Sequence, residues 1–364
     1  MALRSSCSRS MSWWRKVWCE RTHLSSPSEQ TDKGRGMESK MIDRLEAVVR
    51  TELPVDEELR IVKHRLMPDG ASPAGLEKEK KRISVVTGIH GDELEGQYVC
   101  YELIRRIRQN ADRLAGIVDI YPAMNPFGIN NITRGIPAFD LDINRLFPGH
   151  QDGDMNEYIA AEILNDLEGT ALAIDIHASN IFLTEVPQIR INEQHKEELV
   201  PIARKANVDF VWVHGANTVL EATLAYSLNS RGIHTLVVEM GVGMRITEEY
   251  GDQLVDGIFS LMSELGIWKE RVLPTHEPVL CYDESGQDVY YLNAGVSGIF
   301  MKKKAHGSMT EAGECIGIIV NPLTGELLSE VKAPGKGWLF TIREYPVVDE
   351  GSLLGRILRA EALS

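Results

Sequence analysis

Short β-type runs alternate with helical segments between about residues 81 and 268, and this alternation constrains the fold more than any other feature of the chain. The β-type runs are ISVV, IVDIYPAMN, ALAIDIH, DFVWVH and HTLVVEMG. The helical segments are ELEGQYVCYELIRRIRQ, MNEYIAAEILNDL, EELVPIARKA and EEYGDQLVDGIFSLMSELG. Strands that alternate with helices are typical of an α/β domain, and apolar runs of this kind indicate strands buried on both faces. The sequence therefore predicts an α/β domain with a largely parallel central sheet.

A different pattern begins after Leu273. The remaining segment holds short β-type runs divided by Gly, Pro and Asn, as in AGVSGIFMKK, CIGIIVNPLTGELL, VKAPGKGWLFTI and GSLLGRIL. Runs of this length and spacing are typical of a small all-β unit. We therefore expect a catalytic domain over 37–272 and a β-rich C-terminal domain over 273–364.

The first 36 residues differ from the rest of the chain. They are rich in Ser and Arg and carry seven basic against three acidic side chains. The segment reads as a transit-peptide mimic, a binding arm or an extension ahead of a start at Met37. We favour the extension and expect residues 1–36 to be disordered.

The charge and the cysteines narrow the classes of partner. A formal charge of −14 on 364 residues argues against a nucleic-acid-binding surface. The five cysteines are scattered and form no CxxC spacing, which disfavours a disulfide framework and a thiolate metal site. No apolar run approaches the length of a membrane span. We expect a cytoplasmic protein that binds neither nucleic acid nor membrane.

Polar side chains stand where the predicted strands end. Ligands of open α/β sheets bind outside the carboxyl ends of the strands, so residues from several strand ends can meet in space. The candidates are His90, Asn125, His177, His214 and Glu239.

His90 and Glu93 form an HxxE pair in the stretch TGIHGDELEG, with glycines on both sides. A catalytic zinc site typically takes three protein ligands from His and carboxylate, so one further histidine would complete it. His177 and His214 both end apolar runs, and Asp175 could support His177 from outside the site. The alternative is a solvated turn whose acid suits a helix N-terminus.

The segment from 125 to 149 has too many Gly, Pro and Asn for an ordinary crossover helix. It concentrates Arg134, Asn144 and Arg145, which could cradle a substrate carboxylate and a developing oxyanion. The alternative is a structural loop held by salt bridges to its own aspartates. Long ordered loops in compact domains are usually functional.

Glu239 lies in VVEMGVG, at the end of an apolar run. A carboxylate in this position suits a general base that takes a proton from water and delivers it to a leaving amine. The alternative is a buried acid paired with an arginine. Arg190 and Arg245 are either contacts for an acidic acyl group or partners of surface acids, and we prefer the second interpretation.

Taken together, these motifs resemble a known family. GIHGDELEG, NPFGINNITRGIPAFDLDINRLFPG, AIDIH and VVEMG follow one another as in the zinc-dependent succinylglutamate desuccinylase/aspartoacylase family, whose members are related to zinc carboxypeptidases of the M14 type. The resemblance covers roughly residues 80–270. The family motif usually reads DLNR where this chain has DINR, a conservative difference.

The resemblance implies a fold and a metal. The fold would be a zinc carboxypeptidase-like α/β domain, with a mainly parallel or mixed sheet flanked by helices, followed by a small all-β domain similar to a lipoyl barrel. One Zn²⁺ per chain would be bound by His90, Glu93 and His177, which decides against His214. The C-terminal domain shows no acceptor lysine, so we expect it to shape the substrate entrance or to mediate assembly into a homo-oligomer.

The resemblance also implies roles for the remaining candidates. Glu239 would activate water, Arg134 would polarise the scissile carbonyl, and Asn144 and Arg145 would hold a substrate carboxylate. The resulting hypothesis is a zinc-dependent deacylase of small N-acyl amino acids. A metallocarboxypeptidase acting on short peptides is the first alternative, and a zinc-binding or ligand-binding protein without turnover is the second. Pocket walls are expected from 181–191 and 218–228.

Overall fold

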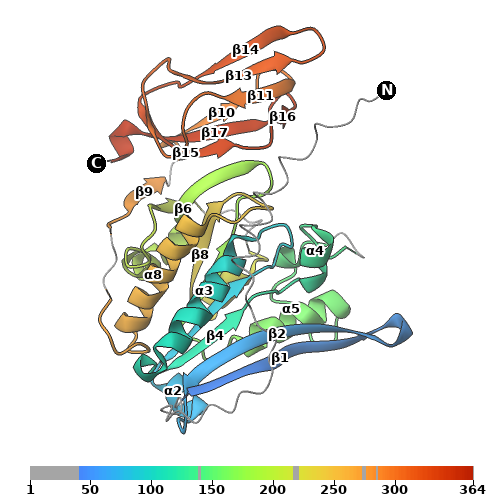
Figure 1. Cartoon of the computed structure of the whole chain (residues 1–364), viewed down its shortest axis with the longest axis vertical. Coiled ribbons are helices and arrows are strands. Elements are labelled where there is room, and N and C mark those ends of the chain that lie inside the picture. Colours follow the sequence, from blue (N-terminus) through green and yellow to red (C-terminus); the bar gives the residue numbers. More distant parts are fainter. Residues whose placement is uncertain (1–40, 138–140, 216–220, 273–275, 284–285, 364) are drawn as a thin grey trace, which may run out of the picture. The chain divides into compact units, whose positions relative to one another are not determined.

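The computed structural model describes residues 41–137, 141–215, 221–272, 276–283 and 286–363 (Figure 1). The predicted N-terminal extension, residues 1–36, lies outside the described residues. None of the described helices combines the length and apolar content that crossing a membrane requires.

Helices and strands alternate through the first two thirds of the described chain (Figure 1). The helices are α2 (Pro73–Lys78), α3 (Glu95–Gln109), α4 (Pro126–Asn131), α5 (Met155–Asp166), α6 (Lys196–Ala203), α7 (Leu224–Ser230) and α8 (Glu248–Glu264). The strands up to α8 are β1 (Met41–Leu53), β2 (Glu57–Pro68), β3 (Arg82–Thr87), β4 (Ile117–Tyr121), β5 (Leu172–His177), β6 (Leu183–Asn192), β7 (Phe210–His214) and β8 (His234–Gly241).

The remaining strands follow α8. They are β9 (Val279–Asp283), β10 (Val289–Asn293), β11 (Gly298–Lys302), β12 (Met309–Thr310), β13 (Cys315–Asn321), β14 (Glu326–Lys332), β15 (Gly337–Arg343), β16 (Val347–Val348) and β17 (Leu353–Arg359). The predicted β-rich C-terminal region is therefore confirmed.

A mixed sheet forms the centre of the fold. Its main path through the described strands runs β1-β2-β4-β3-β5-β8-β6-β15-β17-β10. The block β4-β3-β5-β8 is parallel, whereas β2 joins β4 and β6 joins β8 in antiparallel pairs. The predicted α/β class, with a mainly parallel or mixed sheet, is confirmed.

Helices cover this sheet on both faces. One core cluster joins α3 and α8 to the sheet, with Val99 and Leu254 packed among residues such as Ile174. The other joins α5 to the opposite face, with Ile159 packed among residues such as Ala173. Burial on both faces explains why these strands read as nearly continuous apolar runs.

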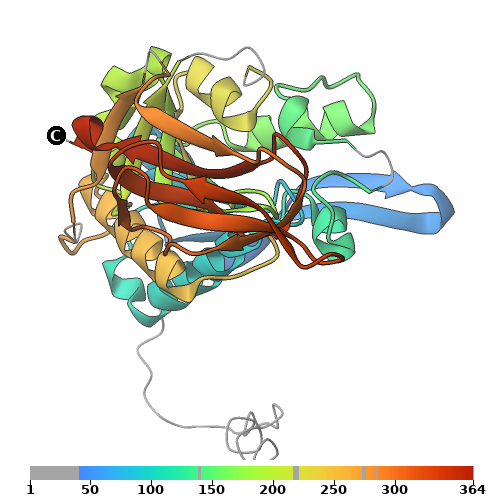
Figure 2. The same ribbon diagram turned by 90° about the horizontal axis from the view of Figure 1, so that it is seen from above.

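Two parts of the sheet were not expected from the sequence. The β1–β2 hairpin lies at the edge of the sheet and extends to one side of it (Figure 1 and Figure 2). Strand β6 carries Glu185, Gln188 and Arg190 as well as Pro187. Because such residues are unusual in a central strand, the sequence did not predict one here.

The C-terminal strands continue the central sheet. Strand β15 pairs with β6 in antiparallel register, from Thr341 opposite Glu185 to Arg343 opposite Leu183. A second, antiparallel sheet of described strands follows the order β14-β13-β11-β16. Figure 2 views these orange and red strands from above. The domain boundary after residue 272 stays a prediction.

Candidate metal centre and surrounding cavity

A cavity of about 530 Å³ opens where β3, β5 and β8 end. Its lining includes a residue that follows β3, the last residue of β5 and a residue near the end of β8, namely His90, His177 and Glu239. This is the position at which ligands enter open α/β sheets. Both predicted wall segments contribute to the lining, for example through Leu183 and Tyr226.

The loop between β3 and α3 carries two of the candidate ligands, and glycine shapes it. Gly88 has a φ of +69°, in the left-handed region that glycine adopts without strain. A Cβ atom on Gly91 would lie only 1.9 Å from the carbonyl carbon of Gly128 in α4. The loop can therefore turn sharply and pass against the α4 backbone, which aims His90 and Glu93 at one point.

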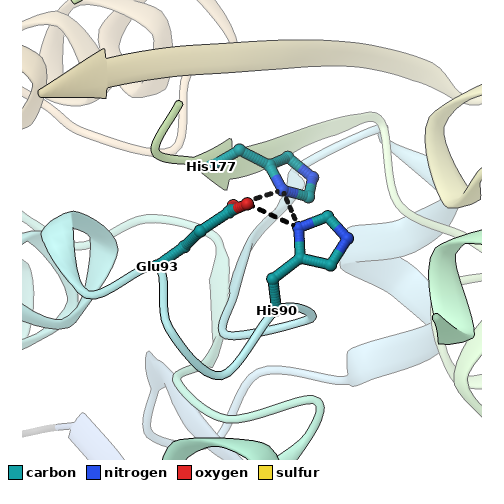
Figure 3. Close-up of side chains that lie close together, drawn as sticks. All are labelled: His90, Glu93 and His177. Carbon is teal, nitrogen blue, oxygen red and sulfur yellow. Dashed lines mark hydrogen bonds and ion pairs between the residues drawn. The ribbon is translucent and has the colours of Figure 1, made fainter. Parts of the chain in front are cut away.

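His90, Glu93 and His177 meet in this cavity (Figure 3). Their three potential ligand atoms lie within 4.8 Å of one another, and all three residues are buried. His90 Nδ1 lies 2.8 Å from Glu93 Oε1, and His177 Nδ1 lies 3.0 Å from Glu93 Oε2. The two Nδ1 atoms are 3.3 Å apart. Two imidazole nitrogens and a carboxylate oxygen that converge in this way could hold a metal ion.

A carboxylate faces the outer nitrogen of each imidazole. His90 Nε2 lies 3.1 Å from Asp142 Oδ1, and His177 Nε2 lies 3.2 Å from Asp175 Oδ2. Partners of this kind orient a ligating histidine and leave its Nδ1 atom free for a metal. Asp175 therefore lies within ion-pairing distance of His177, although neither of its side-chain oxygens has a hydrogen-bond partner among the described residues.

The electrostatics of the group follow from burial and close charges. Burial alone would lower the pKa of His177, but the charges of Asp175 and Glu93 and the hydrogen bond that the ring donates to Glu93 raise it well above its ordinary value. Burial likewise opposes ionisation of Glu93, but both histidines outweigh it and lower the pKa of that carboxyl. The site therefore favours an ionised carboxylate beside positive charge.

Arg134 and Asn144 come from the irregular segment after α4. Arg134 Nη1 donates to Glu93 Oε1 at 3.0 Å, and Arg134 Nη2 lies 3.2 Å from Asp142 Oδ2. The side-chain oxygen of Asn144 accepts a hydrogen bond of 2.9 Å from the backbone N–H of Leu224. That bond orients the amide of Asn144, which lines the cavity.

Arg145 also lines the cavity. Its Nη1 donates to the carbonyl oxygen of Asn144 at 2.7 Å. Within the described part of the chain, no carboxylate lies within ion-pairing distance of the Arg145 guanidinium. A cation in this position is suited to an anionic group of a ligand.

Glu239 projects from β8, directly across the ladder from His177. Arg190 Nη1 lies 3.4 Å from Glu239 Oε1. Burial is the largest influence on the pKa of Glu239 and raises it, against the charges of Arg190 and His177. The carboxyl is therefore a better proton acceptor than an ordinary glutamate.

The remaining residues that the sequence suggested for the site differ in their position relative to the cavity. His214 lines the cavity but lies outside the metal-ligand group, and its Nδ1 is 3.1 Å from the carbonyl oxygen of Gly215. Arg190 does not pair with surface acids as we had preferred, because its partners are the buried Glu185 and the cavity-lining Glu239. Arg245 is exposed and lies outside the cavity lining.

Several cavity residues were missed in the sequence. Trp212, Tyr291 and Arg356 all line the cavity, although none lies in a recognisable motif. Glu185 also lines it and lies in the expected wall segment 181–191, but the sequence did not single it out. Trp212 belonged to a predicted strand, but an apolar strand residue gives no signal for a binding site. Tyr291 and Arg356 come from the C-terminal strands, whose contact with the cavity depends on tertiary structure.

Comparison with known proteins identifies a family model and a curated relative that match this chain. The family model of the succinylglutamate desuccinylase/aspartoacylase catalytic domain matches residues 79–265, which is more than half of the chain. A curated relative, N-alpha-acetyl-L-2,4-diaminobutyric acid deacetylase of Halomonas elongata, is 34% identical over 101 residues. That match spans 28% of this chain and 29% of the relative.

Solved structures share the fold over most of their length. The ectoine utilization protein EutE (DoeB) from Ruegeria pomeroyi, in a product-bound structure, aligns with a TM-score of 0.72 and 18% identity, over 88% of this chain and 95% of that one. A succinylglutamate desuccinylase/aspartoacylase from Rhodobacter sphaeroides aligns with a TM-score of 0.71 and 20% identity, over 86% and 95%. At these identities the likeness concerns the fold alone.

Proposed function

Because the chain belongs to the succinylglutamate desuccinylase/aspartoacylase family, we propose that it hydrolyses the amide bond of a small N-acyl amino acid and that His90, Glu93 and His177 hold one zinc ion. The observation that carries the proposal is the convergence of these three ligands in a cavity that Glu239 and Arg145 also line.

The donor set suits zinc. Two imidazole nitrogens and one carboxylate are a common ligand set of catalytic zinc, which keeps a further position open. Both imidazoles present Nδ1 to the site while a carboxylate holds Nε2. When bound, zinc would supply a Lewis acid that polarises the scissile carbonyl and makes water more acidic.

The protein's own side chains supply the remaining roles. Glu239 accepts a proton from the attacking water and later delivers it to the leaving amine, a task that suits its raised pKa. The Arg134 guanidinium donates to the developing oxyanion. Asn144 and Arg145 hold the substrate carboxylate, for which Arg145 offers a guanidinium that pairs with no described acid.

The substrate class follows the family and its relatives. The curated relative is named for the deacetylation of an N-acetylated diamino acid. For this chain we propose only the coarser class, a small N-acyl amino acid whose carboxylate reaches Arg145.

The test is the variant Glu239→Gln. We expect it to keep the metal content of the wild-type protein and to lose most of the hydrolysis of N-acyl amino acids, because an amide cannot accept the proton from water. Metal content by elemental analysis and hydrolysis rate are measured on the same samples. Glu264→Gln on the surface of α8 is the matched control. Full activity in Glu239→Gln would refute the assignment.

A carboxypeptidase that releases the last residue of a short peptide is the second candidate. Arg145, whose guanidinium pairs with no described carboxylate, favours it as well, because a peptide's terminal carboxylate fits the same guanidinium. A panel of N-acetyl amino acids, N-succinyl amino acids and dipeptides separates the two functions. If the protein is a deacylase, as we propose, an N-acyl amino acid gives the highest kcat/KM among the substrates of the panel.

A further inference from the structure

A cluster of four charged side chains lies in the cavity beside the metal-ligand group. Glu185 and Arg190 belong to β6, and Glu239 belongs to β8. The fourth member is Arg356 from the C-terminal strand β17, which lies 171 residues from Glu185 in the sequence. The C-terminal region thereby contributes a cation to the candidate active site.

The four side chains form one continuous chain of contacts. Arg356 Nη1 donates to Glu185 Oε1 at 2.8 Å. Arg190 Nη2 donates to both oxygens of Glu185, at 2.9 and 2.8 Å, and Arg190 Nη1 lies 3.4 Å from Glu239 Oε1. Through Glu185 and Arg190, the C-terminal guanidinium is thus linked to the proposed general base.

Burial makes each member depend on the others. Glu185 is fully buried, and the side chains of Arg356 and Glu239 are each only 16% exposed. Both guanidinium groups also lie near the ring of Trp212, at 5.8 Å and 6.0 Å from its centroid. Two cations and two anions balance in charge, and loss of one would leave an uncompensated charge in a buried place.

Several hydrogen-bond donors surround the carboxylate of Glu185, and Arg356 supplies one of them. Glu185 Oε1 accepts from three donors, Ser179 Oγ at 3.0 Å, Arg190 Nη2 and Arg356 Nη1. Arg190 contacts Glu185 through Nη2 alone, and its buried Nε has no hydrogen-bond partner among the described residues. This one-nitrogen contact leaves the other end of the guanidinium, Nη1, directed at Glu239.

We propose that Arg356 is a positioning residue for Glu239: by holding Glu185, it keeps the Arg190 guanidinium directed at the Glu239 carboxylate. The inference rests on the proposed function for its catalytic meaning, but its structural content does not depend on it. Without Arg356, Glu185 keeps Ser179 Oγ as a donor but loses the guanidinium that opposes Arg190. Its carboxylate then turns to accept from Arg190 Nε and Nη2 together, the bidentate geometry that guanidinium prefers with a carboxylate. Arg190 Nη1 then leaves Glu239.

The kinetic test compares Arg356→Met with the wild type. We expect kcat to fall by about 10- to 100-fold, the loss that a misplaced catalytic group causes. KM and metal content should stay unchanged, because Arg356 contacts neither the proposed ligands nor the proposed carboxylate site. Arg356→Lys keeps one cationic donor for Glu185 and should recover most of the lost kcat.

Arg359→Met is the matched control. Arg359 lies on the same strand and stacks 4.1 Å from the centroid of Tyr290, outside the cavity lining. We expect its kcat to equal that of the wild type. If Arg356→Met does not fold, Arg356→Gln, which retains an amide donor but no charge, replaces it. Unchanged kcat, an equal loss in Arg359→Met, or a loss confined to KM would overturn the proposal.

A crystal structure of Arg356→Met separates this inference from the proposed function. We expect the distance from Arg190 Nη1 to Glu239 Oε1 to exceed hydrogen-bonding range and Arg190 Nε to approach Glu185. An unchanged Arg190 would overturn the inference even if the protein is a deacylase. A displaced Arg190 in a protein without turnover on any N-acyl amino acid would support the positioning role and refute the proposed function instead.

Discussion

At the scale of single residues, the neighbours of a histidine decide its role. His177 and His214 both end apolar strands, and the sequence alone left the choice between them open. In the structure, His177 Nδ1 faces Glu93 and His90, whereas His214 Nδ1 faces the carbonyl oxygen of Gly215. His214 ends β7, which pairs with β6 and not with β5, and its ring nitrogens lie outside the ligand group.

This difference predicts opposite behaviour of two alanine variants. His177→Ala should lose bound metal, because it removes one of three proposed protein ligands. His214→Ala should keep the metal content of the wild type. Both variants are purified alike and analysed for metal per chain. Equal metal content in the two variants, whether high or low, would contradict the ligand assignment.

The sequence predicted that residues at strand ends would meet, and three of them line the cavity. His90, His177 and Glu239 follow or end apolar runs, and the carboxyl ends of neighbouring parallel strands converge by geometry. Glu185 and Arg356 could not be found in this way. Each lies within a strand, and their contact spans 171 residues of sequence.

At the scale of secondary-structure elements, periodicity and composition predicted most helices and the doubly covered strands. The expected segments contain β4, β5, β7 and β8 and the centre of β3, because burial on both faces demands apolar residues at nearly every position. Strand β6 escaped prediction because its polar residues face other polar groups: Glu185 and Arg190 pair with each other and with the residues around them.

A second set of buried charges joins strands at the other side of the sheet. Asp119 on β4 is fully buried and accepts hydrogen bonds from Arg65 on β2, at 2.8 and 2.6 Å. Arg82 on β3 donates to the same carboxylate at 2.9 Å. The carboxylate therefore ties three neighbouring strands together.

Asp119→Asn should reduce the free energy of unfolding at pH 7 by about 3 to 5 kcal/mol, because it leaves buried guanidinium groups uncompensated. Burial would raise the pKa of Asp119, but Arg65 and Arg82 outweigh burial and lower it. A lowered folded-state pKa contributes stability above the ordinary carboxyl pKa, and that stability is lost as the pH falls through the folded value. The difference in free energy of unfolding between the wild type and the variant should therefore become smaller below about pH 4.

Denaturant unfolding at several pH values measures the difference in free energy of unfolding between the wild type and Asp119→Asn. Glu264→Gln is the control, since Glu264 forms a half-exposed ion pair with Lys205 and contributes little to stability. A variant as stable as the wild type at pH 7, or a gap that widens in acid, would contradict the structural role of Asp119.

At the scale of the whole described chain, the C-terminal strands are part of the site as well as of the sheet. The sequence predicted a separate β-rich unit, because short β-type runs replace the alternation of strands and helices after Leu273. Pairing of β15 with β6 joins the C-terminal strands to the central sheet, and Tyr291 and Arg356 reach the cavity from this region. Strand pairing across 150 residues and more depends on tertiary packing, for which local patterns carry no signal.

We propose that metal-dependent hydrolysis of an N-acyl amino acid occurs at the His90, Glu93 and His177 group. The most direct test is the hydrolysis rate of the best N-acyl amino acid in the panel, measured before metal removal by a chelator, after it, and after one equivalent of Zn²⁺ is restored. We expect activity to disappear with the metal and to return with zinc. Full activity of the metal-free protein, or no hydrolysis of any N-acyl amino acid by the zinc-loaded protein, would contradict it.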